Sequence, residues 1–228
     1  MPGDGARREP VITIDGPAGA GKTTVARELA RRLGYRLLDT GAMYRALAWT
    51  VAQAGLAAED GAALRRHLDS VELELREDRV FVNGRDVTAE IRTPAISALT
   101  SRLTTVAPVR TKVTPLQQRL AAAGGIVLEG RDTGTVVCPD AEVKFYLDAA
   151  LDERARRRHA ELAALGQTSG IDAVRAELAA RDAQDRGREL APLRKAPEAV
   201  EIDTTGLTVE QVVERMLGEV ERQCCTRS

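Results

Sequence analysis

Short apolar runs alternate with amphipathic stretches at the beginning of the chain. Residues 11–14 form a β-branched run that ends at a Gly-Pro turn. Residues 22–33 then repeat apolar side chains at helical spacing and stop at Gly34, which predicts a helix. An extended run over residues 35–38 and a second helical pattern over about 42–54 follow. This β-α-β-α order predicts an α/β fold with a parallel sheet.

The segment from 71 to 87 interrupts this rhythm. Apolar residues alternate there with charged ones, and Asn83-Gly84 stands between two alternating runs. Asn-Gly in that position is a strong hairpin signal, so we expect an antiparallel insertion. The α/β pattern returns with apolar runs at 126–128 and 143–147, which we interpret as further strands of the parallel sheet.

The last third of the chain is predicted to be mostly helical. Residues 151–189 are helical in pattern and rich in arginine, with a glycine- and serine-containing break at 166–170. A short strand is expected over 200–204. Thr208 is expected to cap a final helix from 209 to about 222.

Length and composition are those of one soluble globular domain. The chain has 228 residues, of which 43% are hydrophobic and 29% charged, and its formal net charge is −1. A near-neutral chain with 3% aromatic residues lacks the basic field and the stacking surface of a nucleic-acid-binding protein. No apolar run is long enough to span a bilayer. We therefore expect neither a nucleic-acid nor a membrane partner.

The spacing of the three cysteines indicates the cellular compartment of the protein. Cys138, Cys224 and Cys225 have no metal-ligand spacing, and this usage is typical of a reducing environment. We expect a cytoplasmic protein. No feature of the sequence demands an oligomer, so a monomer is expected.

The most specific motif is a phosphate-binding loop. Residues 16–23 match G-x-x-x-x-G-K-[ST] directly after a predicted strand and at the start of a predicted helix. Backbone N–H groups and the helix N-terminus would face the phosphates of ATP, Lys22 would reach the β- and γ-phosphates, and Thr23 would hold Mg²⁺ directly or through water. The expected ATP-binding residues are Gly16, Pro17, Ala18, Gly19, Ala20, Gly21, Lys22, Thr23 and Thr24.

Two further motifs follow predicted strands and suggest a phosphorylated acceptor. Residues 39–45 combine an acid and a hydroxyl with Tyr44 and Arg45, which we place on the first turn of the next helix. Residues 129–132 follow the apolar run at 126–128, and Glu129 occupies the position of an acid that helps hold Mg²⁺. Taken singly, such arginines are as often solvated or paired within a loop. Two such motifs at two strand ends favour a binding site, because ligands of open α/β sheets bind there.

An arginine cluster lies in the predicted helical region. Arg181, Asp185 and Arg188 fall on one face of a helix. A surface helix carrying ordinary ion pairs is the plain alternative. The excess of arginine favours instead a lid over a polyphosphate, which excludes water and stabilises charge during phosphoryl transfer. Further cations lie upstream at Arg154, Arg157 and Arg158.

Together these motifs resemble the bacterial cytidylate kinases, a family of P-loop nucleoside monophosphate kinases. The resemblance runs from about residue 10 to about residue 220 and rests on segments 11–22, 38–45, 86–92, 129–137 and 181–188. It implies the reaction of ATP with CMP or dCMP, with Mg²⁺, to give ADP and CDP or dCDP. It also implies a three-layer P-loop domain with a parallel central sheet, divided into a core of about 10–42, 94–150 and 195–222, a nucleotide-binding insertion of about 60–93 that contains the hairpin, and an arginine-rich helical lid of about 154–190.

The same resemblance implies residue roles. Arg157 and the neighbouring lid arginines would face the transferred phosphate. Arg181 and Asp185 would contact the ribose, and Thr40 belongs to the acceptor motif. The implied ligands of the acceptor phosphate are Tyr44, Arg45, Arg131 and Arg188. The implied cytosine readers are Ser101, Arg110 and Asp132. The residues expected to act on the reacting phosphates are Lys22, Arg131, Arg157, Arg181 and Arg188.

Chemistry supports a cytosine nucleotide as the acceptor. Cytosine presents an exocyclic amino donor, which Asp132 and Ser101 can accept, whereas uracil presents a carbonyl there. The attacking phosphate oxygen is already ionised at neutral pH, so no general base is needed. Three alternatives stay open: another nucleoside monophosphate such as UMP, a metabolite alcohol with Asp39 as the base (as in shikimate kinase), and an ATPase or switch that acts on a macromolecule.

Overall fold

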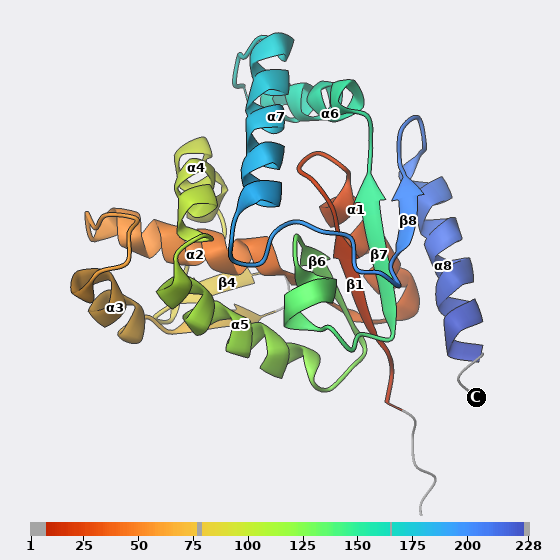
Figure 1. Ribbon diagram of the computed structural model, residues 1–228, viewed down its shortest axis with the longest axis horizontal. Coiled ribbons are helices and arrows are strands. Elements are labelled where there is room, and N and C mark those ends of the chain that lie inside the picture. The colour runs from red at the N-terminus through yellow and green to blue at the C-terminus, as the bar shows by residue number, and fades with distance from the viewer. Residues whose placement is uncertain (1–7, 77–78, 165, 226–228) are drawn as a thin grey trace, which may run out of the picture.

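The main sheet has five parallel strands. A computed structural model describes residues 8–76, 79–164 and 166–225 (Figure 1). The strands lie in the order β2-β6-β1-β7-β8, so the strand that precedes the phosphate loop is central. Their bounds are β2 (Arg36–Asp39), β6 (Ile126–Gly130), β1 (Val11–Asp15), β7 (Val143–Asp148) and β8 (Val200–Asp203). The predicted α/β class and all five predicted strands are confirmed, with shifts of a residue or two at their ends.

Helices cover both faces of this sheet. Ile12 and Ile14 of β1 pack in one core with α1 (Lys22–Leu33) and α8 (Val209–Cys225). Val11 points the other way and shares a second core with α2 (Thr40–Gln53) and α5 (Ala107–Ala121). Alternate residues of a strand point to opposite faces, so a strand buried on both faces is apolar throughout. The result is the predicted three-layer arrangement (Figure 1).

The helix α2 begins earlier than its apolar pattern indicates. Asp39 is its N-cap, and one carboxylate oxygen accepts a hydrogen bond from the amide of Ala42 across 2.8 Å. Tyr44 and Arg45 therefore lie on the second turn of α2, one turn later than predicted.

A small antiparallel sheet is inserted between α2 and α4 (Pro94–Leu103). The Asn83-Gly84 turn joins β4 to β5 with φ of 48° and 77°, which is the left-handed geometry that Asn-Gly favours in hairpins. This confirms the predicted hairpin, and β3 adds a third strand to it. The inserted elements are α3 (Ala62–Asp69), β3 (Leu73–Arg76), β4 (Arg79–Val82), β5 (Arg85–Asp86) and the short 3₁₀ segment η1 (Glu90–Arg92).

Two helices form the arginine-rich region beyond the carboxyl edge of the sheet: α6 (Leu151–Ala164) and α7 (Ile171–Gly187) (Figure 1). They share a small apolar core, and Ala18 of the phosphate loop packs into it. The loop and the helical pair are thus packed directly against each other. None of the helices in the described ranges has the length and the hydropathy needed to cross a membrane.

The connection from β6 to β7 contains a π-helical segment, η2 (Thr133–Val137). Asp15 at the end of β1 holds its first turn, accepting hydrogen bonds from the amides of Thr133 (2.9 Å) and Gly134 (2.8 Å). This anchor fixes the chain directly after Asp132, one of the predicted site residues.

Candidate functional site

The phosphate loop joins β1 to α1 and leaves the first turn of α1 without a side-chain cap. Gly16 has a φ of 147°, and a Cβ there would lie 1.9 Å from the carbonyl oxygen of Leu147, so only glycine fits. Gly19 and Gly21 also have positive φ, which lets the backbone wrap around a ligand. The uncapped N–H groups and the dipole of α1 make this loop a site for anions.

Lys22 is buried beneath this loop, and its ammonium donates a hydrogen bond to the carbonyl oxygen of Pro17 across 2.7 Å. Burial lowers the pKa of Lys22, and the nearby Arg131 guanidinium lowers it further. A polyanion in the loop would offset both effects, because it stabilises the charged ammonium.

Thr23 and Glu129 meet where α1 passes the end of β6. The Thr23 hydroxyl donates to a carboxylate oxygen of Glu129 across 2.6 Å. Parallel pairing places Asp39 of β2 beside Glu129. Burial raises the pKa of Glu129, and the neighbouring Asp39 carboxylate raises it further. A hydroxyl and two carboxylates at one sheet edge form an oxygen-rich site where a divalent cation would be favourable.

Four arginines line the same cavity: Arg45, Arg131, Arg181 and Arg188. Burial lowers the pKa of Arg181 to about 10, and the neighbouring Arg131 guanidinium adds to this. Hydrogen-bond partners are missing for Arg45 Nε, Arg181 Nε and Arg188 Nη2, although all three atoms are buried. Buried cations with unused donors that repel one another are typical of a site for an anionic ligand.

Asp185 of α7 restrains this group of arginines. Its Oδ2 accepts a hydrogen bond from Nε of Arg131 across 2.9 Å, and its Oδ1 lies 3.7 Å from a guanidinium nitrogen of Arg188. The end of β6 and the arginine-bearing face of α7 are thus held together by one carboxylate.

The far end of the site is built around Asp132. One of its oxygens accepts a hydrogen bond from Arg110 of α5, and the other lies 3.7 Å from Arg188. Arg110 also donates to the carbonyl oxygen of Thr104 (3.2 Å), and its guanidinium stands over the ring of Tyr44, 5.7 Å from the ring centroid. Ser101 of α4 completes this end and is bonded to Gln184 of α7.

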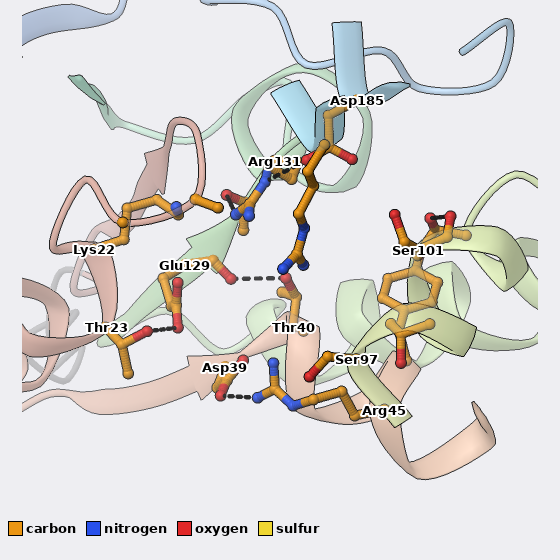
Figure 2. A pocket seen from close by; sticks show the side chains of 18 of the residues that line it. Lys22, Thr23, Asp39, Thr40, Arg45, Ser97, Ser101, Glu129, Arg131 and Asp185 are labelled. Carbon is orange, nitrogen blue, oxygen red and sulfur yellow. Dashed lines mark hydrogen bonds and ion pairs between the residues drawn. The ribbon is translucent and has the colours of Figure 1, made fainter. Parts of the chain in front are cut away.

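These groups line one cavity of about 280 Å³ between the sheet edge, α4 and α7. Figure 2 shows Lys22 and Thr23 on one side, Ser101 on the other, and Arg131 between them. The sequence-predicted residues that line it are Ala18, Gly19, Gly21, Lys22, Thr23, Thr24, Thr40, Tyr44, Arg45, Ser101, Arg110, Glu129, Arg131, Asp132, Arg181, Asp185 and Arg188. Their individual roles stay predictions.

Four predicted residues lie outside the lining: Gly16, Pro17, Ala20 and Arg157. The first three belong to the turn of the phosphate loop. Nη1 of Arg157 lies 3.7 Å from the position that a Cβ on Gly21 of the phosphate loop would take, and its expected contact with the transferred phosphate stays a prediction. Arg157 donates to the hydroxyl (3.0 Å) and the carbonyl oxygen (2.7 Å) of Thr204 and to Glu153 (3.0 Å). The neighbouring lid arginine Arg158 lines the cavity.

Sequence reasoning missed part of the wall formed by α4. Ser97, Thr100 and Thr104 line the cavity beside Ser101. These small hydroxyl residues recur at helical spacing, and that recurrence was the available signal. The hydrogen bond between Gln184 and Ser101 could not be predicted from the sequence, because the two residues lie 83 positions apart.

The cavity joins a loop for one polyphosphate to a separate group of buried cations that suits a second anion. With the α/β fold, these two anion sites define a P-loop kinase whose acceptor is itself phosphorylated. The comparisons with known proteins agree with this class. The family described as cytidylate kinase matches residues 12–222.

Two curated relatives carry the same description. A cytidylate kinase of Geobacter sulfurreducens is 50% identical over 92% of each chain. A cytidylate kinase of Symbiobacterium thermophilum is 49% identical over 94% of this chain and 97% of its own. The chain therefore belongs to the cytidylate kinase family, and it is an ATP-dependent nucleoside monophosphate kinase.

A solved structure shares the fold at low identity. An uncharacterised protein from Eubacterium ventriosum superposes with a TM-score of 0.55 at 9% identity, over 93% of this chain and 99% of that one. This likeness concerns the arrangement of helices and strands alone.

Proposed function

We propose that the protein transfers the γ-phosphoryl group of ATP to CMP or dCMP, giving ADP and CDP or dCDP. The observation that carries this proposal is the order of groups along one cavity. Lys22 and Thr23 lie at one end, Ser101 lies at the other, and Arg131 stands between them (Figure 2). Arg110 connects Asp132 to the Ser101 end, because it also donates to the carbonyl oxygen of Thr104. That order matches a donor polyphosphate, a transferred phosphoryl group and an acceptor base.

At the donor end, the backbone of the phosphate loop and Lys22 bind the phosphates of ATP. Thr23 and Glu129 fit Mg²⁺, because a divalent cation beside the buried Glu129 would stabilise a carboxylate whose pKa burial raises. When bound, Mg²⁺ would neutralise part of the negative charge of the phosphates. Within the described ranges, no group of three or more histidine, cysteine or acidic side chains forms a metal cage. An ion shared between the protein and the phosphates agrees with this.

At the acceptor end, Arg45, Arg131 and Arg188 bind the phosphate of CMP. The unused donors of Arg45 and Arg188 point to this role, since an acceptor phosphate would satisfy them. The attacking oxygen belongs to that phosphate and is ionised at neutral pH. The side chains therefore position the two phosphates and stabilise the charge that develops between them, and none of them needs to remove a proton.

Asp132 reads the base. Arg110 donates a hydrogen bond to one carboxylate oxygen of Asp132, which keeps the group in place in the cavity wall. The exocyclic amino group of cytosine can donate to this carboxylate. The carbonyl of uracil would bring a second acceptor against it and leave both unpaired, so UMP is disfavoured.

A metabolite alcohol is a poorer acceptor for this site. Its hydroxyl would need a carboxylate to take its proton, and Asp39 was the candidate. Both oxygens of Asp39 are engaged, one by the amide of Ala42 and the other by Arg45 across 2.7 Å. Asp39 therefore caps α2 and holds Arg45 rather than serving as a base.

We further propose that the protein works as a monomer in the cytoplasm. No feature of the sequence demands an oligomer. The cysteines Cys138, Cys224 and Cys225 have no metal-ligand spacing and are typical of a reducing compartment.

Product analysis tests the reaction. Purified protein is incubated with ATP, Mg²⁺ and one of CMP, dCMP, UMP, AMP or shikimate, and the nucleotides are separated by chromatography. We expect equal amounts of ADP and CDP from CMP, and of ADP and dCDP from dCMP. ATP hydrolysis without a phosphorylated acceptor, or phosphorylation of shikimate alone, would contradict the proposal.

A further inference from the structure

Gln184 of α7 and Ser101 of α4 are joined by two hydrogen bonds. The side-chain nitrogen of Gln184 donates to the backbone carbonyl oxygen of Ser101 across 3.0 Å. The hydroxyl of Ser101 donates to the side-chain oxygen of Gln184, also across 3.0 Å. Ser101 lines the cavity, whereas Gln184 contacts it from outside.

These two bonds determine each other's direction. A backbone carbonyl can only accept, so the amide nitrogen of Gln184 must face it. The amide oxygen of Gln184 therefore faces the Ser101 hydroxyl. Because an amide oxygen is also only an acceptor, the single hydroxyl hydrogen of Ser101 must point towards Gln184.

The consequence for the cavity is a hydroxyl of fixed polarity. A serine hydroxyl ordinarily rotates and can offer a ligand either its hydrogen or its lone pairs. With its hydrogen committed to Gln184, Ser101 offers the cavity only lone pairs. Asp132 at the same end of the cavity is an acceptor as well. Two acceptors favour a ligand amino group and oppose a carbonyl oxygen in the same place.

We propose that Gln184 is a positioning residue that fixes the Ser101 hydroxyl as an acceptor and so increases the preference for cytosine over uracil in the acceptor nucleotide. This inference rests on the proposed function, since it assumes that the base of the acceptor lies against Ser101. Gln184 shares α7 with Arg181 and Asp185, so the same helix that brings cations to the phosphates also sets the polarity of the base-reading hydroxyl.

The test is the ratio of kcat/KM for CMP to kcat/KM for UMP. In Gln184→Ala the hydroxyl of Ser101 is free to rotate and to donate to the uracil carbonyl. We expect the CMP:UMP ratio to fall about tenfold, because one hydrogen bond of ordinary strength changes direction. The change should come mainly from a lower KM for UMP, with the KM for ATP unchanged.

Two further variants test whether Gln184 acts through the Ser101 hydroxyl. In a Ser101→Ala background, Gln184→Ala should have no additional effect on the ratio, since the hydroxyl that it orients is gone. Ala183→Gln places the same amide at the neighbouring exposed position of α7 and should leave the ratio unchanged. Thermal unfolding of each variant verifies that the fold is retained.

Three outcomes would overturn the inference. Activity with CMP and with UMP that falls equally in Gln184→Ala would make the contact a simple brace between α7 and α4. An effect of the same size in the Ser101→Ala background would show that Gln184 does not act through the hydroxyl. Failure of the unaltered protein to phosphorylate CMP would overturn the proposed function itself, and it would be seen before any variant is made.

Discussion

Arg154 of α6 and Asp182 of α7 form an ion pair of 2.7 Å in the interior of the helical pair. The same guanidinium donates to the carbonyl oxygen of Ala18 in the phosphate loop across 3.2 Å. One side chain thus connects α6, α7 and the loop. Asp182 directly follows Arg181 on α7, so this connection also sets where Arg181 stands above the cavity.

Removal of Asp182 should therefore destabilise the protein strongly. Both side chains of this pair are nearly fully buried, at 6% and 4% exposure. Asp182→Ala leaves the buried Arg154 with only a distant ionic partner, Asp148 at 4.0 Å. We expect a loss of about 3–5 kcal/mol in the free energy of unfolding, measured by urea denaturation. The exposed pair between Arg175 and Asp152 joins the same two helices and is the matched control, and Asp152→Ala should cost less than about 1 kcal/mol. Equal small losses would show that the buried pair does not brace the two helices.

Arg181→Ala should lower activity without lowering stability, in contrast to Asp182→Ala. Burial and the neighbouring Arg131 lower the pKa of Arg181, so its charge is unfavourable in the protein without ligands. Its removal should leave the melting temperature unchanged or raise it, while kcat falls by about 1,000-fold, because a cation near the transferred phosphoryl group is lost. Thermal unfolding and steady-state kinetics on one preparation measure both. A parallel loss of stability and activity would make Arg181 a structural residue.

Gly16→Ala should abolish ATP binding. Its Cβ would collide with the carbonyl oxygen of Leu147, and its φ of 147° is unfavourable for alanine, so the loop would have to move. Gly55 is the matched control: its φ is 62° and no atom lies within 4 Å of an added Cβ. Gly55→Ala should cost about 1 kcal/mol of stability and leave ATP binding intact. Calorimetric titration with a non-hydrolysable ATP analogue distinguishes the two, and tight binding by Gly16→Ala would contradict the loop geometry.

The Thr23 hydroxyl should matter for Mg²⁺. Thr23→Val keeps the shape of the side chain but removes the oxygen, whereas Thr23→Ser keeps the oxygen. We expect Thr23→Val to need a higher Mg²⁺ concentration for half-maximal activity and to lose about 100-fold in kcat, and Thr23→Ser to stay close to the unaltered protein. Titration of activity with Mg²⁺ after chelation measures this. Identical Mg²⁺ curves for the two variants would remove Thr23 from the metal site.

The parts of the fold that could be predicted carry local signals. Residues 22–33 were bounded correctly because a glycine loop precedes the helix and Gly34 (φ 71°) ends it. The turn at Asn83-Gly84 was equally local. By contrast, α5 contains Pro115 in its interior, which single-sequence rules read as a helix breaker. The structure retains that helix because Val109 and Val113 of α5 are buried in the core shared with α2.

The candidate site likewise contains parts that local sequence signals predict and parts that they do not. The strand-end motifs correctly predict that Glu129 and Asp39 lie close together, since parallel pairing places these residues side by side. Adjacent residues on a helix point about 100° apart, so the rotation of α6 about its axis decides which of the lid arginines lines the cavity. That rotation is set by tertiary contacts such as the bonds of Arg157 to Thr204 and could not be predicted from the sequence.

We propose that the cavity accepts a cytosine nucleotide and reads its amino group with Asp132. The most direct test is steady-state kinetics of the unaltered protein with CMP and UMP at saturating ATP and Mg²⁺. We predict a kcat/KM for CMP that exceeds the value for UMP by about 100-fold or more, because uracil would leave the buried carboxylate without its donor. Equal kcat/KM values for the two nucleotides would contradict this role of Asp132.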